Sequence, residues 1–414
     1  MSTHTPQSLR PFHVVGEGMY LASSWTWCIG MFLPIILLRD MGAWSWLAFA
    51  IPNVVGAAMM GPVLAARGHS EALTRAHAPA MRLFSIVTLA FQVYFLAWIL
   101  VDLPREIRLW LLAIVFVVIV LSGRHGRNTR WSRIAVIITY FVSAALGAFY
   151  VSQVGLPSLP ATIGPMARDL AFLAPVCLLG FALCPYLDLS FHAVRQRTPG
   201  REGTLAFIIG FGVFFLSMIV LTLAYAPSVL AAVNVAPAAA GWLPGASVAT
   251  PLTGAGWAIL AHLTVQASIT AAIHQGFARL PDAAPTPSGE AVDATPTSRK
   301  LLASLGVLAP VSVILAPVVA VLSLPGYAGL TMHEIAYRCF LAFYGLLAPA
   351  YAWTCMMPSW SAPAAPQSKH LRALAIAIVC ATPFYWFGFI ERQYAALAAG
   401  VMVILASRLI AWRR

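Results

Sequence analysis

An aspartate and a histidine one helical turn apart are the residues of this chain best suited to acid–base chemistry. Asp188 and His192 lie four residues apart in an apolar stretch, so a helix places both on one face. A carboxylate beside an imidazole, each partly removed from water, can exchange protons near neutral pH and so predicts proton coupling. The alternative is that both residues lie at a membrane interface, where they cap or anchor the helix.

Two further pairs of polar residues have the same spacing. Glu334 and Arg338 are predicted to neutralise each other on one helix face, which is a structural role. His262 and Gln266 face a cavity or satisfy a neighbouring helix, because polar side chains often form hydrogen bonds across membrane helices. Neither alternative is excluded by the spacing.

The elements that carry these residues must lie in a membrane. Of the 414 residues 60% are apolar and 9% charged, the mean hydropathy is +0.83, and a soluble protein carries about 25% charged residues. The apolar stretches are continuous and about twenty residues long, unlike the alternating strands of a membrane barrel. The composition therefore predicts an all-α polytopic membrane protein with about twelve transmembrane helices. The expected spans are 17–38, 44–65, 81–101, 107–122, 131–153, 169–191, 203–225, 254–275, 301–322, 334–356, 371–389 and 394–412.

The basic residues predict the orientation of these spans. Of the 25 Lys and Arg residues, 19 fall on one side of the expected membrane, which is typical of the cytoplasmic side. Both termini are therefore expected in the cytoplasm of a protein of the inner membrane. The net charge of +12 does not indicate nucleic acid, because the basic residues are spread over short loops.

The six cysteines lie in or beside apolar segments without the spacing of a zinc site or a disulfide framework. No nucleotide-binding, hydrolase or metal motif occurs, so neither an enzyme nor a cofactor is expected. The expected partners are a small-molecule solute and membrane lipid, without nucleic acid or an obligate protein partner.

Two spans carry a glycine shortly before a proline. Gly30 precedes Pro34 in the first span, and Gly180 precedes Pro185 in the sixth, which runs in the opposite direction. Interrupted helices at matching positions of two halves indicate an inverted repeat with a central binding site in a transporter. Kinks in two unrelated membrane helices are the alternative. The residues predicted to bind substrate lie around the two breaks and are Ser23, Ser24, Trp25, Trp27, Gly30, Gly180, Cys184 and Tyr186.

This pattern divides the chain into five spans plus five, followed by two accessory helices. The predicted units are a cytoplasmic segment 1–16, a first repeat 17–153, a second repeat 154–357 and accessory helices 358–414. A segment 280–298, which contains many Pro, Ala, Thr and Ser residues, is predicted to be a disordered cytoplasmic linker.

The first two spans resemble the solute:sodium symporter family of the amino acid/polyamine/organocation superfamily, whose members have the LeuT fold. The resemblance lies in the order of glycine, proline and tryptophan: Gly30, Pro34, Gly42, Trp44, Trp46, Gly56 and Gly61. It implies a substrate at the breaks of spans one and six and a sodium ion between spans one and eight. Ser268 and Thr270 would then bind sodium, although the family's adjacent hydroxyl pair is missing here.

Taken together, these features predict a secondary active transporter of a small organic solute, coupled to sodium or protons, with alternating access around the two breaks. Apart from the implied sodium, no metal and no catalytic residue is expected. A carrier of the major facilitator type also has twelve spans. A membrane sensor or accessory subunit that kept a transporter fold without transport is the other alternative.

Overall fold

The computed structural model describes residues 10–101, 103, 105–124, 130–155, 167–232, 254–278, 311, 314–320, 322 and 325–412. Apart from an isolated bridge between Tyr327 and Leu330, the regular structure of these residues is helical. Among them, eight helices are long and apolar enough to cross a membrane, and one bent pair makes a ninth. The chain is an all-α polytopic membrane protein, which confirms the fold class predicted from composition.

Residues 11–154 form seven α-helices. The first helix begins at Pro11, six residues before the predicted start of the first span at residue 17. Proline suits the first turn of a helix, because backbone N–H groups there have no partner within the helix. The helices are α1 (Pro11–Trp25), α2 (Cys28–Met41), α3 (Ala43–Val63), α4 (His69–Ala76), α5 (Ala78–Val101), α6 (Arg105–Arg124) and α7 (Arg130–Val154).

The second half contains more interruptions, because 3-10 and π turns divide its spans. The sixth span comprises α8 (Ala167–Leu183), the 3-10 turn η1 (Cys184–Leu187) and α9 (Leu189–Arg197), and the next comprises α10 (Gly200–Ile209), the π turn η2 (Gly210–Phe215) and α11 (Leu216–Ala232). The remaining elements are α12 (Gly254–Ala278), α14 (Met332–Ala342), η3 (Phe343–Leu347), α15 (Ala348–Tyr351), η4 (Ala352–Met356), η5 (Met357–Ser359), α16 (Ser368–Phe389) and α17 (Ala396–Trp412).

Some predicted segments lie outside the described residues. They are the linker 280–298, most of the expected span 301–322 and the first nine residues. The last predicted span forms a helix, α17, whose apolar part is shorter than a full membrane crossing.

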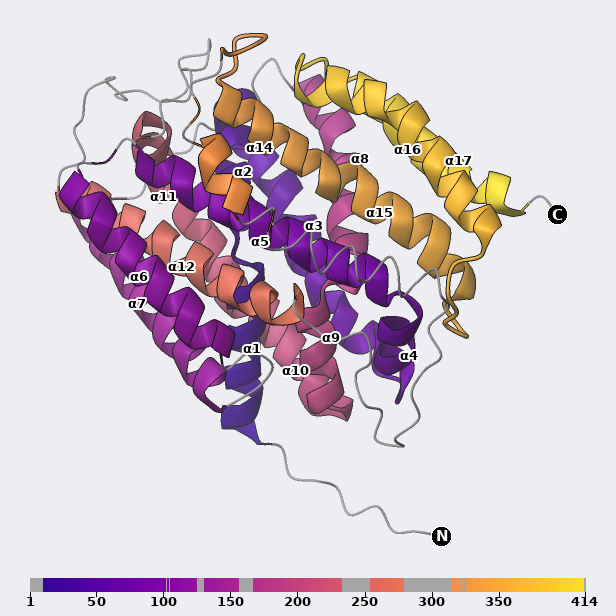
Figure 1. Cartoon of the computed structure of the whole chain (residues 1–414), viewed down its shortest axis with the longest axis horizontal. Helices are drawn as coiled ribbons and strands as arrows, with labels where there is room; N and C mark the ends of the chain where they lie inside the picture. Colours follow the sequence, from indigo (N-terminus) through magenta and orange to yellow (C-terminus); the bar gives the residue numbers. More distant parts are fainter. Residues whose placement is uncertain are drawn as a thin grey trace.

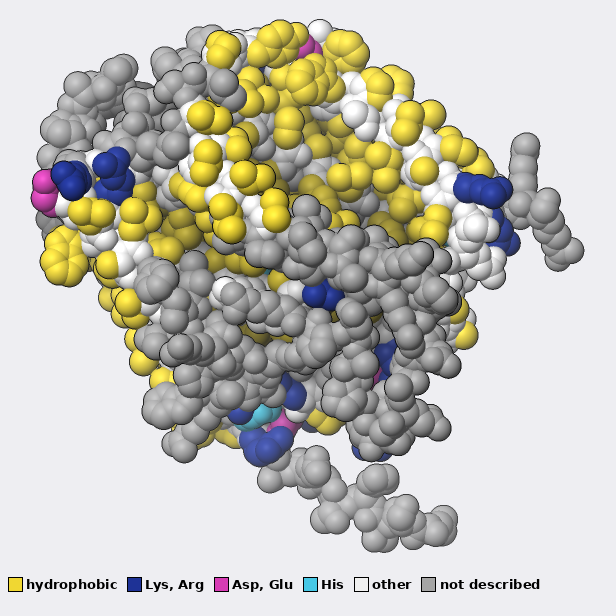
Figure 2. Space-filling model, in the orientation of Figure 1, with side chains coloured by type: hydrophobic (Ala, Val, Ile, Leu, Met, Phe, Trp, Pro, Cys, Tyr) yellow, Lys and Arg dark blue, Asp and Glu magenta, His cyan; other side chains and the backbone are white. Residues whose placement is uncertain are grey.

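The helices differ in how deeply they are buried. In α12, 78% of the most apolar window is buried, and this helix packs against α1, α5, α6 and α7. In α16 the corresponding share is 28%, and α16 pairs with α17 along one edge of the molecule (Figure 1). Hydrophobic side chains cover much of the face shown in Figure 2, and Lys and Arg are sparse there. Such an apolar exterior suits contact with lipid. The difference in burial makes α12 the central helix and α16 a peripheral one.

Candidate functional site

The first membrane helix breaks between α1 and α2, which are bent by 57° relative to each other. The hydroxyl of Thr26 donates to the carbonyl of Ala22 at 2.7 Å, and Trp27 is extended and begins α2. The break lies within the interrupted stretch expected from the sequence, at Thr26 and Trp27, whereas Gly30 and Pro34 lie inside α2. The break forms where a threonine hydroxyl competes for the last carbonyls of α1.

Tyrosines from other helices satisfy backbone carbonyls beside this break. Tyr337 donates to the carbonyl of Cys28 at 2.9 Å, and Tyr225 donates to that of Met31 at 3.1 Å. Both carbonyls lie in the first turn of α2, directly after the break, so the two bonds tie this end of α2 to α14 and α11. The break is therefore held by the surrounding helices and is part of the fold.

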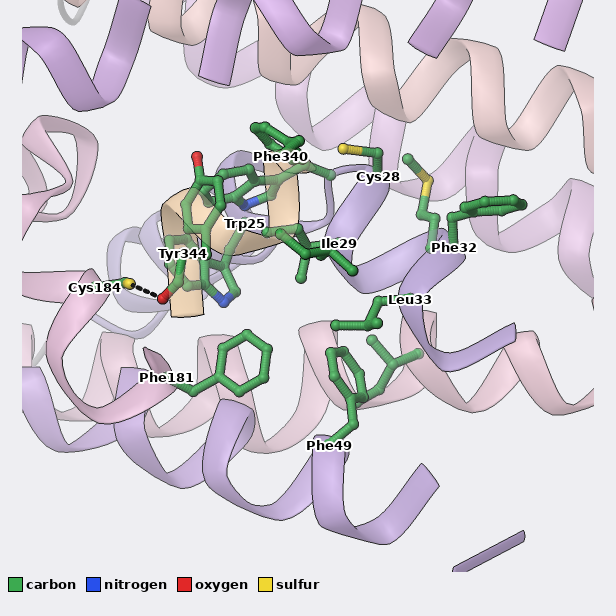
Figure 3. Packing of buried hydrophobic residues seen from close by; sticks show 14 of the residues in the cluster. Trp25, Cys28, Ile29, Phe32, Leu33, Phe49, Phe181, Cys184, Phe340 and Tyr344 are labelled. Atoms are coloured by element: carbon green, nitrogen blue, oxygen red, sulfur yellow. Dashed lines mark hydrogen bonds between the residues drawn. The ribbon is translucent and has the colours of Figure 1, made fainter. Parts of the chain in front are cut away.

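The sixth span breaks where the sequence placed its proline. α8 ends at Leu183, and η1 follows, with Pro185 in its first turn. Asp188 has an extended backbone and caps α9, its carboxylate accepting the amide of Ser190 at 2.8 Å. Cys184 donates its thiol to the carbonyl of Tyr344 at 3.2 Å, which joins this break to η3 (Figure 3).

The carboxylate of Asp188 meets a histidine from α12. Its second oxygen, Oδ2, lies 3.9 Å from Nε2 of His274, and both side chains are fully buried. Neither this oxygen nor either ring nitrogen of His274 has a hydrogen-bond partner of good geometry among the described residues, and the backbone of Ser24 lies beside the His274 ring. A buried carboxylate and imidazole this close, with free polar atoms, can exchange a proton or bind a polar ligand.

His192, which the sequence paired with Asp188, has other ring partners. Its Nε2 contacts the carbonyl of Tyr186 at 3.0 Å, and its Nδ1 contacts the hydroxyl of Ser70 at 2.8 Å. His192 therefore links α9 to η1 and α4. The histidine that lies beside the Asp188 carboxylate is His274 of α12.

Trp27 places its ring among four other rings at the first break. The ring centroids lie 4.6 Å from Trp25, 4.8 Å from Tyr344, 5.7 Å from His274 and 5.8 Å from Phe84. The indole nitrogen of Trp27 has no partner among the described residues, whereas that of Trp25 donates to Asn53 at 2.6 Å. Trp27 therefore connects the break in α1–α2 with the histidine beside Asp188.

Of the two residues expected to bind sodium, both on α12, Thr270 contacts the first break. Thr270 donates to the carbonyl of Ser23 at 2.9 Å, whereas Ser268 donates to the carbonyl of Thr264 within its own helix. The hydroxyl of Ser23 has no partner among the described residues, and that of Ser24 donates to Leu21. Thr270 and Ser23 are thus brought together, while Ser268 is engaged locally.

The remaining predicted substrate residues are used in packing. A Cβ added to Gly180 would lie 2.9 Å from the carbonyl of Tyr344, and one added to Gly30 would lie 3.1 Å from the ring of Phe215. Both glycines therefore permit close helix contacts. Tyr186 is buried, with its ring 5.2 Å from that of Trp360.

An apolar cavity adjoins the two breaks. It lies between α2, α8, α14, η3 and α16 and is partly open to the outside of the molecule. Ile29 and Leu33 line one side and Phe181 the other (Figure 3). Gly180 and Tyr344 also line this cavity, so it reaches the elements that carry the second break.

His274 is the residue of the site that sequence reasoning missed. A signal was present, because His262, Gln266, Thr270 and His274 follow one another at four-residue intervals along one helix. Only the first two were recognised as a pair.

A second cluster of ionisable groups joins α2 to α14. Arg338 contacts Glu334 at 2.8 Å, which confirms the pair expected from spacing, and also binds Asp40. Arg39 binds both Asp40 and Glu334. The four side chains are almost completely buried and carry two positive and two negative charges, so the cluster is neutral as a whole.

The chain matches known proteins among solved structures, but neither a family model nor a curated protein. Among the described residues there is no group of three or more His, Cys, Asp or Glu side chains that could hold a metal ion. Structures of two variants of the manganese transporter of Eremococcus coleocola are 13% identical to it, cover 99% of this chain and 96% of theirs, and give TM-scores of 0.46 and 0.47. Identity this low and a TM-score below 0.5 do not establish a shared function.

Proposed function

We propose that the protein is a secondary active transporter that moves a small organic solute across the cytoplasmic membrane, driven by sodium or protons. The observation that carries this proposal is that Asp188, at the second break, meets His274 of α12, whose ring lies against Trp27 at the first break. Oδ2 of Asp188 and both ring nitrogens of His274 are buried without a hydrogen-bond partner among the described residues. Unwound helix segments at membrane depth are typical of transporter binding sites. Buried ionisable groups in such a place are costly and are kept for function.

The contacts between the breaks support alternating access. Trp27 belongs to the first break, Asp188 caps the helix after the second, and His274 lies against both. A change in occupancy or charge at this point therefore acts on α2 and α9 together. Movement of these two half-helices is the conformational change that we propose.

The lining of the site favours a neutral, zwitterionic or partly apolar solute. The cavity beside the breaks is lined mainly by aliphatic and aromatic side chains. Its one charged residue, Arg338, already binds Asp40, Glu334 and the carbonyl of Phe389. A solute in this cavity thus meets mostly apolar surface, with the polar groups at Asp188 and His274 nearby.

The proposed orientation places both termini in the cytoplasm. Around the N-terminal end of α1, Glu17 is buried and binds Arg197 and Arg133, and Arg10 binds Glu202. The excess of basic residues at this end suits the cytoplasmic side. Labelling of cysteines introduced at either terminus, in intact cells and after permeabilisation, tests this orientation.

The first test needs no substrate. Thermal unfolding of the purified protein is compared in sodium, potassium and choline at equal ionic strength, with Thr270→Val as the variant and Ser268→Ala as its matched control. A bound ion at about ten times its Kd stabilises the folded state by about 1.4 kcal/mol. A sodium-specific rise in Tm that Thr270→Val abolishes supports sodium coupling.

The second test measures transport. Proteoliposomes containing a pH-sensitive dye are challenged with amino acids, amines and carboxylates under imposed sodium and proton gradients. Gradient-driven uptake that Asp188→Asn abolishes supports the transporter. If no solute is taken up and neither cations nor solutes change the unfolding temperature, a sensor or accessory subunit with this fold becomes the better explanation.

A further inference from the structure

The central helix α12 carries a stripe of buried polar side chains that winds slowly around it, by about 40° at each four-residue step. His262, Gln266, Thr270 and His274 are each completely buried and follow at four-residue intervals. Four residues of helix rise about 6 Å, so the stripe extends about 18 Å, more than half the hydrocarbon thickness of a bilayer. Such a stripe in the most buried helix of a membrane protein requires polar neighbours.

Protein neighbours satisfy this stripe only in part. His262 contacts the hydroxyl of Ser143 through Nδ1, but its Nε2 has no partner among the described residues. The same holds for both amide atoms of Gln266 and both ring nitrogens of His274. Buried polar atoms in this state are the usual binding sites of internal water, which makes about three hydrogen bonds each. The stripe is therefore suited to hold a file of water molecules.

The C-terminal end of this stripe, at His274, reaches Asp188 beside the helix breaks. Thr270 bonds to the carbonyl of Ser23 in α1, and His274 lies against Trp27 at the start of α2. Asp188 caps α9 through Ser190. A proton that arrives at the pair thus changes the charge at the N-terminus of α9 and beside the first break.

Other titratable groups face the pair from every element around it. Tyr20 of α1 and Tyr344 of η3, both phenols, interact electrostatically with Asp188. The thiols of Cys28 and Cys184 lie near Tyr344. On the far side of Tyr20, Arg197 and Glu17 bind each other, and Arg133 binds Glu17. His192 is held by Tyr186 and Ser70, with His69 and His77 beyond it, and Arg82 of α5 donates to the carbonyl of Ala278.

We infer that α12 conducts protons: His262, Gln266 and Thr270 order a file of water that delivers a proton to the Asp188–His274 pair, which makes the proton the coupling ion. This inference rests on the proposed transport function. A proton from the water file binds Nε2 of His274, and its former carrier, a hydronium ion, becomes neutral water. The imidazole N–H then donates to the carboxylate, and the 3.9 Å separation shortens to a charge-assisted hydrogen bond of about 2.8 Å.

Fluorescence of Trp27 reports on the pair without any substrate. The ring of His274 lies 5.7 Å from that of Trp27, and a protonated imidazole at this distance quenches indole emission. The contribution of Trp27 is obtained by subtracting Trp27→Phe from the parent protein at each pH. We expect this contribution to fall at least twofold on acidification, to lose its pH dependence in His274→Gln, and to shift along the pH axis in Asp188→Asn.

The matched control is His333→Gln. His333 stacks on Trp98 at 5.3 Å, remote in the chain from the stripe, so its loss should leave the Trp27 contribution unchanged. A Trp27 contribution that keeps its pH dependence in a folded His274→Gln variant would overturn the inference.

Water along the stripe is tested separately by cysteine labelling. His262→Cys and Gln266→Cys are compared with Ala267→Cys, which is equally buried but lies off the stripe, in a background where the exposed Cys339 and Cys380 are replaced by serine. A small, water-soluble methanethiosulfonate reagent should label the two stripe positions at least tenfold faster. Equal, slow labelling at all three positions contradicts a hydrated stripe. Fluorescence and labelling results that agree with the inference would stand even if no solute were transported.

Discussion

Two buried groups of ionisable residues in this protein differ in whether their polar atoms are satisfied. In the cluster between α2 and α14, Arg39, Asp40, Glu334 and Arg338 bind one another, and Tyr394 and the carbonyl of Phe389 add further bonds. At the helix breaks, Asp188 and His274 are as deeply buried but leave polar atoms without partners among the described residues.

This difference separates a structural from a functional use of buried charge. Removal of one partner from a buried ion network leaves an uncompensated charge, so a satisfied cluster resists change. A buried group whose polar atoms lack partners raises the free energy of the folded protein, and binding of a proton or ligand to these atoms lowers it. The cluster between α2 and α14 is therefore expected to hold the fold, and the central pair to respond to ligands.

The largest effect is expected from Arg338→Met. It leaves Glu334 and Asp40 with Arg39 as their one remaining cationic partner from the cluster, so the free energy of unfolding should fall by about 3–5 kcal/mol. Unfolding by SDS in mixed micelles measures the change. Arg392→Met, which removes an exposed arginine bonded to the carbonyl of Ala328, is the control and should change stability by about 0.5 kcal/mol or less.

Removal of both members of a pair should cost less than removal of one. Glu334→Leu combined with Arg338→Met leaves Arg39 paired with Asp40. We expect the double variant to be more stable than Arg338→Met by about 2 kcal/mol, because no uncompensated charge remains. A double variant that is less stable than the single one would show that the cluster acts through packing instead of charge balance.

A smaller loss is expected where one hydrogen bond links α12 to the first break. Thr270→Val removes the bond to the carbonyl of Ser23 and should lower stability by about 1 kcal/mol. Ser268→Ala removes a bond within α12 and should change stability less. Equal losses in the two variants would mean that the contact with Ser23 adds no stability of its own.

The smallest change in stability is expected at the central pair itself. Asp188→Asn keeps an oxygen to cap α9 and removes a buried charge, so stability should change by less than about 1 kcal/mol. The free energy of unfolding of this variant should depend less on pH than that of the parent protein, because the carboxylate of Asp188 is gone. A loss as large as that of Arg338→Met would place Asp188 among the structural charges and remove the contrast between the two groups.

Residue spacing predicted contacts within a helix well and contacts between helices poorly. The Glu334–Arg338 pair was recovered because both residues lie on the same helix face. Asp188 and His192 have the same spacing, but the turn at Asp188 directs its carboxylate away and other helices engage His192. The Gly–Pro spacing indicated an interruption in the first span but not its exact position, since Pro34 is tolerated within α2 and the chain bends at Thr26.

The sequence by itself determined that this protein is helical and lies in a membrane, because long apolar segments have no other stable arrangement in lipid. It also located the second break and marked Asp188 as an unusual charge. Only the tertiary structure decided that Asp188 meets His274, that Trp27 links this pair to the first break and that Arg39 and Asp40 join Glu334 and Arg338. Helical periodicity specifies the neighbours of a residue on its own helix. Its partners on other helices depend on how all the helices rotate and pack, which no local pattern contains.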